Sequence, residues 1–127
     1  MKEVLTENYS SASLRYQQRF LVKNKQKLVS IRVSEVSLFY AEGRINFMKT
    51  TDNKKYMIAQ TMESLMTSLD PADFYRVNRS TIIAFDAIKD MYAYFGGRVK
   101  IILQIPLEKE IIVSKDKVSG FKKWLGE

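Results

Sequence analysis

The chain has 127 residues, enough for one domain, and its 46% hydrophobic and 28% charged residues are typical of a globular protein. The absence of cysteine and histidine excludes disulfides and thiol nucleophiles and removes the commonest general base and metal ligand, so we expect neither an enzyme nor a bound cofactor. The net charge of +7 favours a polyanionic partner such as nucleic acid.

Residues 1–18 are polar and show little periodicity, so we expect a tail or linker ahead of one domain at residues 19–127. The N-terminus has no apolar stretch of signal-peptide length, and no run approaches the roughly 18 apolar residues of a membrane span. Together with the lack of cysteine, this predicts a cytoplasmic protein.

The first half of the domain reads as short strands separated by turn signals. The polar residues 23–25 predict one hairpin turn, Gly43 permits the positive φ of a second turn, and Asp52-Asn53 indicates a third. We expect strands near residues 20–22, 28–33, 36–40, 44–49 and 56–58.

A helical period follows, because apolar residues recur at i, i+3, i+4 and i+7 (Met62, Leu65, Met66 and Leu69). Thr61 is the expected N-cap and Asp70-Pro71 the stop. We expect this short amphipathic helix to pack on a sheet.

The last third of the chain again shows the alternation of apolar and polar residues that is typical of strands. Strands are expected at residues 88–95 and 98–103, joined by Gly96-Gly97, and again at 110–113. Ser114 is the expected cap of a closing helix whose apolar face holds Val118, Phe121, Trp124 and Leu125. With eight or nine short strands, two helices and no βαβ alternation, the predicted fold class is mainly β.

The charge is segregated along the chain. Residues 19–55 carry nine basic side chains against three acidic ones, residues 60–95 are mildly acidic, and the part from Gly96 is basic again. This distribution favours a basic patch over a uniform coat.

Four motifs resemble the LytTR family of bacterial DNA-binding domains. They are Glu35-Val-Ser-Leu-Phe-Tyr-Ala-Glu-Gly43, Asp52-Asn-Lys-Lys-Tyr56 followed by Met62-Glu-Ser-Leu65, Phe74-Tyr-Arg-Val-Asn-Arg-Ser80, and Ile112-Val-Ser-Lys115 ahead of a basic helix. The third is the most specific, and the resemblance covers about residues 19–126. Asn78 departs from the family's frequent histidine, and residues 104–110 form an unusual version of its late hairpin.

The resemblance implies an elongated arrangement of short antiparallel β-sheets that inserts loops into successive major grooves of double-stranded DNA. It also implies a transcription regulator that binds tandem direct repeats and pairs as a dimer on DNA. Such domains usually follow a phosphorylatable receiver domain in two-component response regulators and answer to a sensor kinase.

The first candidate contact loop contains Arg44 and Asn46. Arginine can bond bidentately to guanine and asparagine to adenine. The alternative is a polar hairpin tip that faces water.

The second candidate is the end of the 74–80 motif. Arg79 stands at the position that faces the groove in the family, with Asn78 beside it. Ser80 either bonds a phosphate or caps its own turn. Arg76 has either a DNA-binding role or a structural one, as the ion-pair partner of Asp73, Asp86 or another carboxylate.

The third candidate is the start of the closing helix, where backbone amides attract phosphate and Lys115 and Lys117 add positive charge. Asp116 would repel phosphate, so we expect it to point away or to support the cap.

Two other functional classes remain open. A basic RNA-binding β-module would use exposed aromatic rings, for which Tyr40, Phe47, Tyr92, Tyr94 and Phe95 are candidates, but we expect most of these in the core. A protein-interaction domain is the second alternative.

Overall fold

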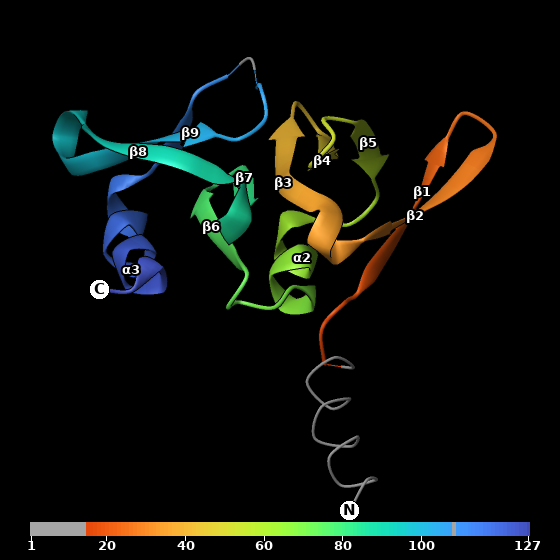
Figure 1. Cartoon of the computed structure of the whole chain (residues 1–127), viewed down its shortest axis with the longest axis horizontal. Coiled ribbons are helices and arrows are strands. Elements are labelled where there is room, and N and C mark those ends of the chain that lie inside the picture. The colour runs from red at the N-terminus through yellow and green to blue at the C-terminus, as the bar shows by residue number, and fades with distance from the viewer. Residues whose placement is uncertain (1–14, 108) are drawn as a thin grey trace, which may run out of the picture.

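The computed structural model describes residues 15–107 and 109–127 and shows short antiparallel sheets that follow one another along the long axis (Figure 1). The sheets have the strand orders β1-β2, β5-β4-β3-β7-β6 and β10-β9-β8. The strands are β1 (Arg19–Asn24), β2 (Lys27–Arg32), β3 (Val36–Glu42), β4 (Ile45–Thr50), β5 (Lys55–Ile58), β6 (Phe74–Asn78), β7 (Thr81–Ala84), β8 (Ile88–Tyr94), β9 (Arg98–Leu103) and β10 (Ile111–Val113), and the helices are α2 (Met62–Ser68) and α3 (Lys115–Leu125). The predicted mainly β class with two short helices is confirmed.

The described residues form more strands than the sequence predicted, because the 74–85 segment folds as the hairpin β6–β7. Asn78 pairs with Thr81, so Arg79 and Ser80 form a two-residue turn. The predicted turns at residues 23–25, 41–43 and 52–53 are confirmed by positive φ angles of 60° at Lys25, 62° at Gly43 and 65° at Asn53. Only Gly43 adopts this conformation without a side-chain penalty.

The five-stranded sheet is buried on both faces at its centre, where the neighbouring residues Leu38 and Phe39 of β3 are both inaccessible. Phe39 is completely buried, and its ring lies 5.2 Å from Phe20 of the β1–β2 hairpin and 6.0 Å from Phe74. Helix α2 packs here through Leu65, as predicted, and the Thr61 hydroxyl accepts the Ser64 amide at 3.0 Å. Met66, expected in the core, is 38% exposed because it lies on the outer side of this short helix.

Residues 17 and 18 bond to the folded body. The Gln17 amide donates to Ser68 O at 2.8 Å, and Gln18 O accepts the Val33 amide at 2.8 Å. Residues 1–14 of the predicted tail lie outside the described residues. In the part of the chain that the structure covers, no helix is long and apolar enough to span a membrane, and no acidic cluster could hold a metal ion.

The expectation that most of the five candidate aromatic residues lie in the core is wrong, because Phe47 and Tyr94 are only half-buried and two others are exposed. Tyr92 is 57% exposed and Phe95 is 75% exposed, because no element covers this side of the three-stranded sheet near its tip. Tyr40, by contrast, is buried.

Helix α3 docks on β6 through Tyr75. The tyrosine ring lies 5.4 Å from Trp124 and 5.8 Å from Phe121, and its hydroxyl donates to Lys117 O at 3.0 Å. Burial, followed by the charge of Asp116, raises the pKa of Tyr75, so the hydroxyl remains a donor. This contact sets where the N-terminus of α3 lies.

The docking leaves no room for a side chain at Gly120. A Cβ there would lie within van der Waals overlap of the Tyr75 hydroxyl, and that ring is held on two sides by aromatic contacts. Gly120→Ala should therefore lower the free energy of unfolding by about 1–3 kcal/mol, although alanine is the better helix former by about 1 kcal/mol. Chemical denaturation measures the change.

The matched background is Tyr75→Phe, which removes the clashing oxygen. In that background Gly120→Ala should be neutral or stabilising. Equal destabilisation in both backgrounds would contradict the steric explanation.

Candidate nucleic-acid interface

The three predicted contact segments lie next to one another. The Ala41 amide, two residues before the Gly43–Arg44 turn, donates to Ser80 O at 2.9 Å. On the other side of the hairpin, the Ser114 amide donates to Val77 O at 3.0 Å. The Arg79–Ser80 turn therefore lies between the end of β3 and the start of α3.

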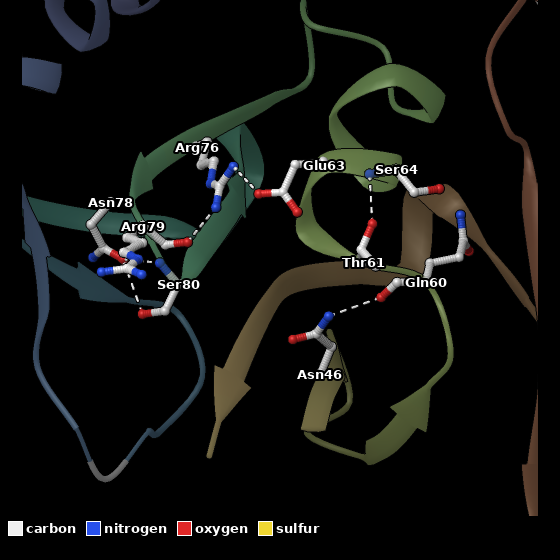
Figure 2. A network of polar contacts seen from close by, with 9 residues as sticks. All are labelled: Asn46, Gln60, Thr61, Glu63, Ser64, Arg76, Asn78, Arg79 and Ser80. Carbon is white, nitrogen blue, oxygen red and sulfur yellow. Dashed lines mark hydrogen bonds and ion pairs between the residues drawn. The ribbon is translucent and has the colours of Figure 1, made fainter. Parts of the chain in front are cut away.

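Asn78 organises this turn. Its Nδ2 donates to Ile112 O at 2.8 Å, and its Oδ1 accepts the Ser80 amide at 3.0 Å and the Ser80 hydroxyl at 3.3 Å (Figure 2). The amide side chain thus ties β6 to β10 and closes the turn. Asn78 and Ser80, both predicted as contact residues, are engaged with each other.

Arg76 supports the same turn from the side of α2. Its Nη1 lies 3.3 Å from Glu63 Oε2, and its Nη2 donates to Arg79 O (Figure 2). The pKa of Glu63 lies below its usual value because a backbone amide and then Arg76 bond the carboxylate. The structural ion pair considered for Arg76 is present, with Glu63 as the partner and not Asp73 or Asp86.

Arg79 differs from these supporting residues. Its side chain is exposed, and it forms no hydrogen bond or ion pair within the described residues. Only its carbonyl is used, as the acceptor for Arg76. The guanidinium fork is therefore available to a ligand while the backbone beneath it is fixed.

A hollow of about 620 Å³ adjoins the turn. It is lined by Arg76, Asn78, Arg79, Ser80, Ser114, Asp116 and Lys117. Ser114 is the N-cap residue, but its hydroxyl makes no capping bond and lies 3.5 Å from Val77 O instead. Asp116, expected to point away or to support the cap, is also among the residues that line this hollow.

Arg44 and Asn46 have different surroundings. Arg44 is exposed on its turn and, in residues 15–107 and 109–127, has no side-chain partner. Asn46 Nδ2 donates to Gln60 O at 2.9 Å and so holds the connection between β5 and α2 (Figure 2). Lys115 is exposed at the start of α3.

Sequence reasoning missed the lysines on the far side of the Gly43–Arg44 turn. Lys109 Nζ donates to Ala41 O at 3.3 Å, so the loop between β9 and β10 reaches the end of β3. That loop has no hydrophobic periodicity from which its position could be predicted. Its basic residues were the only sequence signal for this contact.

Most of the chain matches known proteins. The family model of the LytTr DNA-binding domain matches residues 26–126. The chain is 24% identical over 102 residues to the sensory transduction protein LytT of Oceanobacillus iheyensis, a match that covers 80% of this chain and 42% of that protein. It shares 18% identity and a TM-score of 0.78 with a solved LytTr DNA-binding domain from a Bacillus cereus protein, over 87% of this chain and 99% of that one. At this identity the solved structure supports the shared fold.

The contrast between Asn78 and Arg79 predicts different effects on stability. Asn78→Ala removes three hydrogen bonds and leaves the Ile112 carbonyl and the Ser80 amide without this partner. It should lower the free energy of unfolding by about 1–3 kcal/mol, measured by denaturation. Arg79→Ala should stay within about 0.5 kcal/mol of the parent protein. Similar losses for both variants would show that Arg79 also supports the fold.

Proposed function

The chain belongs to the LytTr family of DNA-binding domains, and from this premise we propose that it reads double-stranded DNA with loops that enter the major groove. In this proposal it regulates transcription as the output domain of a two-component response regulator. The observation that carries the proposal is the exposed, unpaired guanidinium of Arg79 on a turn whose backbone is bonded on both sides.

Arg79 and Arg44 are the proposed base-reading residues. Both side chains project from two-residue turns, and an arginine fork matches the O6 and N7 acceptors of guanine. Each such pair contributes about 1–3 kcal/mol of discrimination against a wrong base.

Lys115, Lys117 and the first amides of α3 are the proposed phosphate contacts. The Ser114 side chain makes no capping bond to those amides, of which the Lys117 amide donates to Ser114 O at 2.8 Å. Phosphate contacts of this kind supply affinity and register, whereas base contacts choose the site.

Asn46, Asn78 and Ser80 enter the proposal mainly as positioning residues. Asn78 and Ser80 hold the turn that carries Arg79, and Asn46 on β4 bonds the connection between β5 and α2. Any DNA contact that they make would use the hydrogen-bonding capacity left after these internal bonds, such as the lone pairs of the Ser80 oxygen, whose hydroxyl donates to Asn78.

The wider assembly is also proposed. Residues 19–127 form the DNA-binding unit, and residues 1–18 link it to an upstream receiver domain that a sensor kinase phosphorylates in the cytoplasm. Two domains would then occupy tandem direct repeats as a dimer. The supporting observation is that the chain spans 42% of the length of its sensory transduction relative, which leaves room for a second domain in that protein.

Substitution of Arg79 tests the base-reading role. A selection from random duplexes first supplies the preferred sequence, and binding is then measured for preferred and scrambled duplexes. Arg79→Ala should weaken binding to the preferred duplex by about fivefold to 150-fold, equivalent to about 1–3 kcal/mol, and should reduce the preference over the scrambled duplex.

Lys122→Ala is the matched control, because it removes one exposed positive charge from α3 on the helix's last turns. It should leave the preference unchanged. If five to seven cations meet phosphates, log K should fall against log salt with a slope of about −5 to −6. A preference for single strands, or an Arg79 variant that discriminates as well as the parent protein, would overturn the proposal.

Asp116 gives a test in the opposite direction. Asp116 lines the hollow together with Lys117, so its negative charge would repel a phosphate bound there. Asp116→Asn should strengthen binding to all duplexes by about 1.5-fold to fivefold, and the gain should shrink at high salt. Asp90→Asn, on β8, makes the same charge change outside the hollow and should have the smaller effect in a fluorescence anisotropy titration.

A further inference from the structure

A second hollow, of about 600 Å³, lies on the other flank of the Gly43–Arg44 turn. Its walls come from β3, β4, β5 and the loop between β9 and β10, and in Figure 1 that loop stands beside the end of β3. Three lysines, Lys49, Lys55 and Lys109, line it together with Tyr40 and Glu42.

The strand register forces two of these lysines together. Lys49 of β4 stands directly opposite Lys55 of β5 on the same face of the sheet. Like charges in directly opposed positions destabilise an antiparallel pair. A pair of like charges that lowers the stability of the free protein is expected where a bound anion neutralises the repulsion.

The third lysine adds to this convergence. Lys55 Nζ and Lys109 Nζ lie 5.7 Å and 5.5 Å from the centre of the Tyr40 ring, and Lys55 Nζ lies 4.2 Å from the centre of the Phe47 ring. The aromatic faces attract each ammonium group but do not cancel its charge.

Only one carboxylate among the described lining residues opposes the three lysines. Glu42 Oε1 lies 3.0 Å from Lys55 Nζ, which leaves the hollow with a net excess of positive charge. The hydrogen bond that Lys55 donates to Glu42 is the largest cause of the raised pKa of Lys55, so that lysine remains protonated at neutral pH.

The lysines also retain donors for a ligand. Lys49 Nζ donates to Pro106 O at 3.5 Å and Lys109 Nζ to Ala41 O at 3.3 Å. An ammonium group has three N–H donors, so each of these contacts leaves others unused. The two bonds position the ammonium groups at the edge of the hollow.

We propose that this hollow binds a phosphate group of the DNA backbone, next to the base pairs that Arg44 reads. The proposal rests on the proposed function and extends it with Lys49, Lys55 and Lys109 as a phosphate site. Lysine suits that task because it is a mobile point charge that needs no fixed phosphate orientation. The site would fix the register of the Gly43–Arg44 turn in its groove.

The test compares two double variants with the same loss of charge. Lys49→Gln with Lys109→Gln removes the two lysines that are not paired with Glu42, and Lys89→Gln with Lys122→Gln removes two exposed lysines elsewhere. The first variant should make the slope of log K against log salt shallower by about 1–2. It should lose the same factor of affinity for the preferred and the scrambled duplex. The second should change the slope by clearly less.

Neutral methylphosphonates placed one at a time in the preferred duplex locate the contact. At one phosphate the substitution should weaken binding by the parent protein but not by the variant lacking Lys49 and Lys109. A substitution pattern that is identical for the two proteins would overturn the phosphate site.

Two further arms keep the result interpretable. The variant Lys49→Arg with Lys109→Arg retains both positive charges and should retain the salt slope. If it loses as much duplex affinity as the glutamine variant, the lysines act by tethering the loop and the inference fails. Titration with inorganic phosphate and a mononucleotide, followed by NMR, tests the other source of the same chemistry. Saturable binding there with unchanged duplex affinity would overturn the assignment to DNA.

The outcomes separate the two proposals. If the parent protein binds no duplex, the proposed function fails. If it binds a preferred duplex and the two glutamine variants behave alike, the proposed function stands and the phosphate site is rejected.

Discussion

The arrangement of the interface depends on the hydrogen bonds made by one neutral side chain, Asn78. Its amide bonds Ile112 of the three-stranded sheet, and its carbonyl oxygen closes the turn through Ser80. The backbone bond from Ser114 to Val77 runs beside it. These bonds connect two sheets that share no strand, so the positions of α3 and of the β6–β7 turn are coupled. A neutral amide can do this without the desolvation cost of a buried charge.

Support and contact are consequently divided between residues of the same short segment. Arg76 is largely buried, pairs with Glu63 and holds Arg79 O, and its Nε has no partner in the described residues. Arg79, three positions further on, is exposed with its guanidinium unused. Two arginines of identical chemistry thus differ in role because β6 directs one toward α2 and the turn directs the other outward. Charge counting along the sequence cannot make that distinction.

Periodicity predicted most of the fold because sheet alternation and the helical repeat of α2 are local properties of the chain. Gly43 marked its turn for the same reason. A turn at Ser80 was one of the alternatives considered, but the hairpin of β6 with β7 was not predicted, because no glycine or positive φ marks this connection. The partners Gln60 for Asn46 and Ile112 for Asn78 are 14 and 34 residues away, and such pairings follow only from tertiary packing. The exposure of Tyr92 and Phe95 has a similar origin, because alternation does not say which face of a small sheet will be covered.

The internal bonds have a consequence for how such a surface can recognise DNA. A loop that becomes ordered only on binding loses conformational entropy at that moment, at about 1–2 kcal/mol per residue fixed in the backbone. Here the turns that carry Arg44 and Arg79 are already held, by the β3–β4 register on one side and by Asn78 and Arg76 on the other. Only the arginine side chains themselves remain to be ordered. Preorganisation of this kind leaves more of the contact energy as affinity, and it lets base discrimination depend on arginine geometry while lysines at the two flanks set the strength of binding.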